Sequence, residues 1–185
     1  MGLDMYLTQK YYVQNWEHNS LKNHWDIKIM HGGETTNIST DKITYITTEV
    51  MYWRKANAIH KWFVENVQDG KDDCGEYYVS DEKLKELLNI CTKILESSKL
   101  IKGKINNGYS YKNGEKIPII EDGEVMENID TAQELLPTTS GFFFGGTEYD
   151  EWYYRGLEDT KKELTKILSN KNDDDNSNFY YHSSW

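Results

Sequence analysis

The chain has 185 residues and a formal net charge of -10, with 31 acidic against 21 basic side chains. This balance excludes a general nucleic-acid binder, because neutralising a phosphate backbone needs a basic face. There is no apolar run of about 18 residues, so we expect no membrane-spanning helix. Cys74 and Cys91 are too few for a disulfide framework, and the N-terminus lacks a signal-peptide pattern. We therefore expect a single cytoplasmic domain over residues 1–185.

The first third of the chain favours strands followed by a helix. Residues 3–13, 25–30 and 43–48 are rich in alternating, aromatic or β-branched side chains, which predict three strands. Residues 49–67 predict a helix, because a turn of about 100° per residue gathers their apolar side chains on one arc. That arc contains Tyr52, Ala56, Ile59, Phe63, Val64 and Val67.

The middle of the chain predicts a second helix and then an insertion. Residues 77–79 form a short extended piece, and Ser80 is a suitable N-cap for an amphipathic helix over 81–97. Residues 99–124 contain two hairpin turn dipeptides, Asn107-Gly108 and Asn113-Gly114. We expect a small meander of short strands there, inserted into the domain.

The last third predicts two helices and a closing strand. A short helix over 131–136 is capped by Asp130 and stopped by Pro137. Residues 142–144 read as a short buried strand between glycines. A long helix then runs from Thr147 to about residue 169, and a turn or linker over 170–178 leads to an aromatic strand over 179–185. The expected fold is α+β, with an antiparallel or mixed sheet that includes both termini and packs against about three main helices.

Two stretches combine the residue types of a binding pocket. In the first, Tyr52 and Trp53 can stack on a flat ring, Arg54 and Lys61 can pair with phosphate, and Asn57 can read a hydrogen-bonding edge, with His60 beside them. The second has glycines before a predicted helix start, which expose backbone amides to an anion. Its candidate ligand-binding residues are Thr138, Gly141, Phe142, Gly146, Thr147 and Tyr149.

Plainer interpretations of both stretches stay open. The first also fits an amphipathic helix with solvated cations and one core histidine, and the second fits a buried strand followed by a capped helix. The carboxylates Glu148, Asp150 and Glu151 can serve acid–base chemistry, but a helix dipole favours acids in a first turn anyway. The histidines and cysteines lack metal-ligand spacing, so we expect neither a metal nor a cofactor.

Four motifs resemble those of a family of small, mostly uncharacterised proteins of tailed phages and prophages. The similarity covers nearly the whole chain except residues 99–124, and its motifs stand at residues 1–7 (MGLDMYL), 52–63 (YWRKANAIHKWF), 136–145 (LPTTSGFFFG) and 148–150 (EYD). The resemblance implies a phage accessory protein that acts in the host cytoplasm. Such proteins often counter host defence, some of them as sponges that hold a nucleotide immune signal without cleaving it.

The leading hypothesis is therefore a protein that sequesters a small nucleotide-like ligand, such as a cyclic ADP-ribose isomer or a cyclic oligonucleotide. A nucleotide- or phosphoester-processing enzyme with His60 as the acid–base group is the alternative. A third hypothesis is an inhibitor that binds a host protein through the 99–124 insertion. A homo-oligomer is left open.

Overall fold

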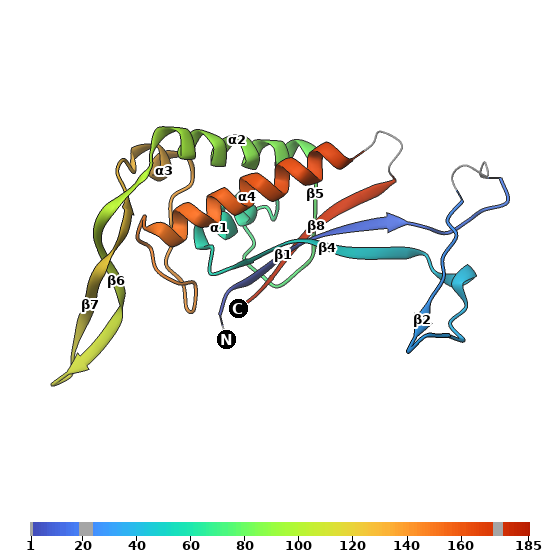
Figure 1. Ribbon diagram of the computed structural model, residues 1–185, viewed down its shortest axis with the longest axis horizontal. Coiled ribbons are helices and arrows are strands. Elements are labelled where there is room, and N and C mark those ends of the chain that lie inside the picture. The colour runs from blue at the N-terminus through green and yellow to red at the C-terminus, as the bar shows by residue number, and fades with distance from the viewer. Residues whose placement is uncertain (1, 19–23, 172–175) are drawn as a thin grey trace.

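The computed structural model describes residues 2–18, 24–171 and 176–185, and its body is one antiparallel sheet covered by helices on one face (Figure 1). The sheet has the strand order β4-β1-β8-β5. Its strands are β1 (Asp4–Tyr12), β4 (Tyr45–Arg54), β5 (Tyr77–Val79) and β8 (Ser177–Ser184). The predicted α+β fold with strands from both ends of the chain is confirmed.

Alternation along the strands separates a packed face from an open one. On β1, Met5 and Leu7 are fully buried beneath the helices, while Tyr6 points to the opposite face. There the Tyr6 ring stacks on His182, with centroids 4.8 Å apart, and contacts Tyr52 at 5.3 Å. The open face of the sheet is therefore lined by rings rather than by aliphatic side chains.

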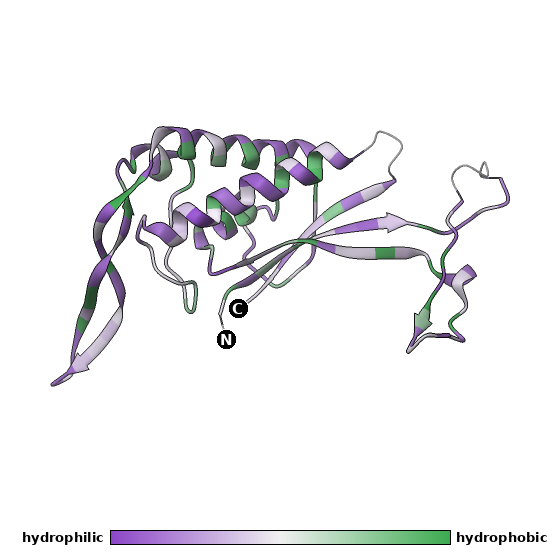
Figure 2. Cartoon of the chain, in the orientation of Figure 1, coloured by the Kyte–Doolittle hydropathy of each residue, from purple (hydrophilic) through white to green (hydrophobic). Residues whose placement is uncertain are grey.

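Within the described residues, four α-helices complete the body: α1 (Asn57–Asn66), α2 (Asp81–Ser97), α3 (Asp130–Leu135) and α4 (Glu151–Asn170). The predicted cap of α2 is confirmed, because Ser80 Oγ accepts a hydrogen bond of 3.3 Å from the Lys83 amide. Helices α2 and α4 bury one stripe each, including Leu84 and Leu164. Figure 2 shows hydrophilic and hydrophobic segments alternating along both helices, as expected for helices with one buried face.

The predicted insertion is a long two-stranded hairpin, β6 (Leu100–Lys112) and β7 (Glu115–Met126), which projects from the body (Figure 1). The prediction of a meander of short strands is wrong, because only one of the two predicted turns, Asn113-Gly114, reverses the chain. The Asn107-Gly108 dipeptide instead falls in a bulge, where the pairing register shifts between Asn106 and Tyr109. A bulge bends and twists a ribbon without ending it.

The predicted helix over 49–67 is wrong in its first part, because residues 49–54 belong to β4. Met51 and Trp53 are buried while Tyr52 and Arg54 are exposed, which is the period of a strand. The chain then turns at Lys55, whose φ of 57° lies in the left-handed region. Because of this break, the apolar arc predicted from Tyr52 onward does not exist as one helix face.

Three further boundaries differ from the prediction. Residues 25–29 are not a strand, and only β2 (Met30–His31) pairs with β3 (Glu34–Thr35), because this stretch has no buried face to pack. Residues 142–144 form a turn, with Phe142 82% exposed and Phe143 at a φ of 69°. Helix α4 begins at Glu151 rather than at Thr147. In the predicted turn over 170–178, positions 172–175 lie outside the described residues.

Candidate functional site

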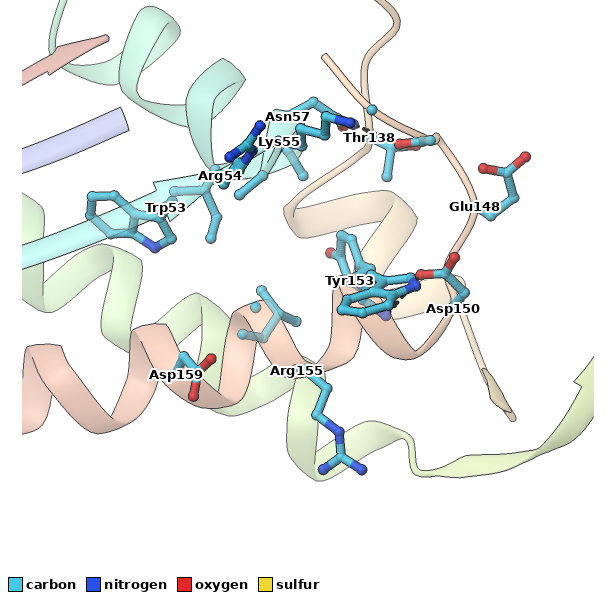
Figure 3. A pocket seen from close by; sticks show the side chains of 18 of the residues that line it. Trp53, Arg54, Lys55, Asn57, Thr138, Glu148, Asp150, Tyr153, Arg155 and Asp159 are labelled. Carbon is cyan, nitrogen blue, oxygen red and sulfur yellow. Dashed lines mark hydrogen bonds between the residues drawn. The ribbon is translucent and has the colours of Figure 1, made fainter. Parts of the chain in front are cut away.

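A cavity of about 760 Å³ runs along the first half of α4 (Figure 3). Its walls are the end of β4, the start of α1, the loop that leads into α4, and the bulge of the β6–β7 hairpin. Figure 3 shows Arg54, Lys55 and Asn57 on one side of the space; across from them lie Asp150, the N-cap of α4, and Tyr153 and Asp159 on α4. The two stretches singled out in the sequence therefore meet at one place.

Half of the predicted ligand-binding residues line this cavity: Tyr52, Trp53, Arg54, Asn57, Thr138 and Gly146. The other half do not: His60, Lys61, Gly141, Phe142, Thr147 and Tyr149. Thr147 and Tyr149 instead support the wall, since Thr138 Oγ1 donates to the Thr147 carbonyl at 2.9 Å and the Thr138 amide donates to the Tyr149 hydroxyl at 3.3 Å.

Asn57 fastens the two stretches to each other. Its Nδ2 donates to the carbonyl oxygens of Phe144 at 3.2 Å and Gly146 at 2.7 Å. Its Oδ1 accepts from the amide of Thr139 at 3.0 Å. The side chain is only 4% exposed. Because the amide group is committed to three loop groups, Asn57 shapes the cavity and is not free to read a ligand edge.

The start of α1 gives one end of the cavity a positive character. Ala56 stands at the N-cap, and no side chain within the described residues caps this helix; Ala58 and Ile59 of its first turn line the cavity. Arg54 lies beside it, with Nε 4.0 Å from the nearer carboxylate oxygen of Asp4. Lys55 forms no ion pair with any described residue. Two cationic residues and the positive end of a helix dipole thus border the cavity at this end.

The start of α4 is already occupied by a carboxylate. Asp150 Oδ1 accepts hydrogen bonds from the amides of Trp152 at 3.0 Å and Tyr153 at 3.2 Å. Burial raises the pKa of Asp150, with a smaller contribution from the nearby carboxylate of Glu148. The amides at this helix start are therefore not free for the predicted anion, whereas the start of α1, which also lines the cavity, has no side-chain cap.

Aromatic side chains contribute in different ways. Trp152, on the first turn of α4, lines the cavity and is 74% exposed, so its ring is free to stack on a ligand. Trp53 is buried, and its Nε1 donates to Thr160 Oγ1 at 2.8 Å. The Tyr153 hydroxyl donates to the Leu136 carbonyl at 2.9 Å. Tyr52 donates from its hydroxyl to Asp4. Trp152 alone among these four combines high exposure with an uncommitted ring face.

Sequence reasoning missed Lys55, Trp152, Arg155 and the hairpin residues Asn106 and Asn107, all of which line the cavity. The exposure of Trp152 could have been predicted, because a large ring two residues after a helix cap lies at the surface unless another element covers it. The place of the hairpin residues in the cavity could not have been predicted, because an Asn-Gly dipeptide predicts a turn and not a contact with a distant helix.

His60 does not line the cavity; it is buried between Tyr181 in the core and Asp72 at the surface. Its Nε2 is 3.0 Å from Asp72 Oδ1, and its Nδ1 is 2.7 Å from the Tyr181 hydroxyl. An ionised carboxylate only accepts, so Nε2 carries the proton and Nδ1 accepts from Tyr181. Burial lowers the pKa of His60, while the Asp72 carboxylate opposes that shift. Both ring nitrogens are engaged and the side chain is 1% exposed.

Other candidate chemistry finds little support in the described part of the chain. Within residues 2–18, 24–171 and 176–185 no group of three or more His, Cys, Asp or Glu side chains could hold a metal ion. Cys91 is in the core, where burial raises the pKa of its thiol to about 12. Among these same residues, no helix has both the length and the apolar character needed to cross a bilayer.

Comparison with known proteins gives no relative. No protein-family model, no curated protein and no solved structure matches the chain. The resemblance to phage proteins therefore stays a prediction, and the function is argued from the cavity.

Proposed function

We propose that this is a binding protein that holds a small, anionic, nucleotide-like ligand in the cavity beside α4 without cleaving it. The observation that carries the proposal is the meeting of Arg54, Lys55 and the uncapped start of α1 in one cavity of an acidic chain. The net negative charge of the chain repels anions in general. Cationic residues beside a helix N-terminus therefore favour the binding of one specific anionic ligand.

The dimensions of the cavity support a ligand of nucleotide size. Its volume of about 760 Å³ falls within the range of roughly 300–1,000 Å³ that small-molecule sites occupy. Trp152 and Asp159 both line it, and seven helical residues span about 10 Å. The cavity therefore extends at least this far along α4, a length that suits a nucleotide.

The carboxylates in the cavity suit the middle of such a ligand. Three acidic side chains, Glu148, Asp150 and Asp159, line the α4 side opposite the cations. Asp150 is engaged as the helix cap and Glu148 accepts from the Thr147 amide, which leaves Asp159 on the α4 side, across from Arg54 (Figure 3). Carboxylates accept hydrogen bonds from ribose hydroxyls, so a sugar between ring and phosphate matches this charge pattern.

Sequestration fits the geometry better than catalysis. The catalytic candidate His60 is buried, has partners on both ring nitrogens and does not line the cavity, whereas a general acid–base group must reach the reacting atoms. With the resemblance to phage accessory proteins, this supports the narrower proposal of an anti-defence protein in the host cytoplasm. Its ligand would be an immune signal such as a cyclic ADP-ribose isomer or a cyclic oligonucleotide.

Calorimetry against a panel of these nucleotides, followed by mass spectrometry of the ligand released on denaturation, tests the proposal. The expected result is binding of at least one panel member and its recovery intact. Recovery of an altered product would support the enzyme hypothesis instead. Failure of a folded sample to bind any member would overturn the proposed function.

A further inference from the structure

The bulge of the β6–β7 hairpin forms the far wall of the cavity. Asn106 and Asn107 line the same space as Lys55, although they lie in the inserted hairpin. The base of the hairpin is tied to the start of α4, since the Met126 amide donates to the Tyr149 carbonyl at 3.0 Å and Val125 bridges Asp150. These bonds hold the hairpin beside the first turn of α4.

Neighbouring hydrogen bonds fix which way the two asparagine amides point. Asn106 Oδ1 accepts from the Gly108 amide at 3.1 Å, and an amide hydrogen can only meet the oxygen. Asn107 Nδ2 donates to Glu121 Oε2 at 2.7 Å, and a carboxylate can only accept. In the described part of the chain, the Nδ2 donor of Asn106 and the Oδ1 acceptor of Asn107 are left without a partner.

We infer that the hairpin bulge is the nucleobase-reading end of the cavity, an inference that rests on the proposed function. Asn106 donates to and Asn107 accepts from the hydrogen-bonding edge of a base, while Trp152 stacks on its face. Every nucleobase carries a donor and an acceptor side by side on one edge, and asparagine amides are well suited to such an edge. An anion without a base has no such edge to pair with the Asn106 donor and the Asn107 acceptor.

The arrangement gives the two ends of the cavity separate tasks. Asn57, predicted to read the ligand edge, has all its hydrogen-bonding groups committed to the loop. The unpaired amide groups of Asn106 and Asn107 line the same cavity as the 74% exposed ring of Trp152, and the cationic residues Arg54 and Lys55 lie next to α1. Phosphate affinity therefore comes from the body of the protein and base recognition from the insertion.

Calorimetry with ADP and pyrophosphate, two ligands that differ by one adenosine, tests the inference on the full chain. In the double variant Asn106→Ala/Asn107→Ala, we expect ADP affinity to fall about 25-fold, at about fivefold for each lost hydrogen bond, while pyrophosphate affinity stays unchanged. The matched control is Tyr111→Ala, further along β6 and 74% exposed, which should change neither affinity.

A second variant covers the case in which the double variant misfolds. Asn106→Asp keeps an oxygen that accepts from Gly108, removes the donor and adds a negative charge. Its added charge acts on both ligands, so the ratio of the ADP and pyrophosphate affinities isolates the lost hydrogen bond, and that ratio should fall about fivefold.

The outcomes separate this inference from the proposed function. Equal affinities of the wild-type protein for ADP and pyrophosphate, or ADP binding that survives both asparagine variants, would overturn base reading by the hairpin and leave the anion site in place. Binding of neither ligand nor of any nucleotide in the panel would overturn the proposed function, and base reading with it.

Discussion

Replacing Asn57 with alanine should loosen the wall of the cavity more than any other single amide substitution in α1. The change removes three hydrogen bonds, of 3.2, 2.7 and 3.0 Å, from a buried side chain. It leaves two carbonyl groups and one amide of the 139–146 loop without a partner. At about 1 kcal/mol for each bond, the free energy of unfolding should fall by about 3 kcal/mol.

Urea denaturation followed by tryptophan fluorescence measures this change. The matched control is Asn66→Ala on the same helix, which removes one partly buried hydrogen bond of 2.9 Å to the Trp62 carbonyl and should cost about 1 kcal/mol or less. The denaturation slope should stay the same, because the fold is otherwise intact. Equal losses for the two variants would refute the view that Asn57 fastens the loop to α1.

Two further predictions concern a titrating group and a glycine. Because burial lowers the pKa of His60 below its ordinary 6.5, the unfolded chain binds the proton first, so stability falls as the pH drops below about 6.5. Asp72→Asn removes the charge that opposes this shift and should lower the pKa further in an NMR titration of the imidazole; an unchanged or higher value would contradict the assignment. Gly145→Ala combines a φ of 93° with a new Cβ 3.0 Å from that of Lys55, and its unfolding free energy should fall by about 2 kcal/mol. Gly70→Ala, with a φ of 76° and open space, should cost about 1 kcal/mol; equal costs in urea denaturation would argue against close packing at Gly145.

The elements that the sequence predicts well are those whose local signals agree with their packing. Helix α2 has a cap at Ser80 and a clean apolar stripe, and both are present in the structure. Strand β8 alternates between buried and more accessible side chains along its whole length, and β1 does so over its first four residues. In these elements the periodicity of the sequence and the geometry of the sheet point to the same answer.

Prediction fails where tertiary contacts decide the backbone. The apolar residues of the 49–67 stretch have helical spacing, but pairing with β1 holds the first part of the stretch extended. The left-handed backbone of Lys55 then ends the strand. Residues 142–144 are apolar enough for a buried strand. Their glycine neighbours and the hydrogen bonds from Asn57 make a turn there instead.

In the candidate site, too, the features that local sequence patterns indicate differ from those that tertiary contacts decide. The residue types of the stretch around Asn57 and of the 138–146 loop singled out both as candidate pocket walls, but the helix start at Asn57 was not predicted, because residues 49–67 were expected to form one helix. The place of Asn106 and Asn107 in the cavity was not predictable either, since it depends on how the hairpin docks against Tyr149 and Asp150. Nothing in the local sequence of the hairpin encodes that contact.

The central claim is that Arg54 and Lys55 make one end of the cavity an anion site. The most direct measurement is calorimetry of the wild-type protein and the Arg54→Gln/Lys55→Gln variant against the nucleotide panel. We predict a loss of about 100-fold in affinity, at about 1.5 kcal/mol for each charge-assisted hydrogen bond. The control Lys61→Gln, which lies outside the cavity and pairs with Glu65 at 3.8 Å, should bind like the wild-type protein. Equal affinities of the double variant and the wild type would contradict the claim.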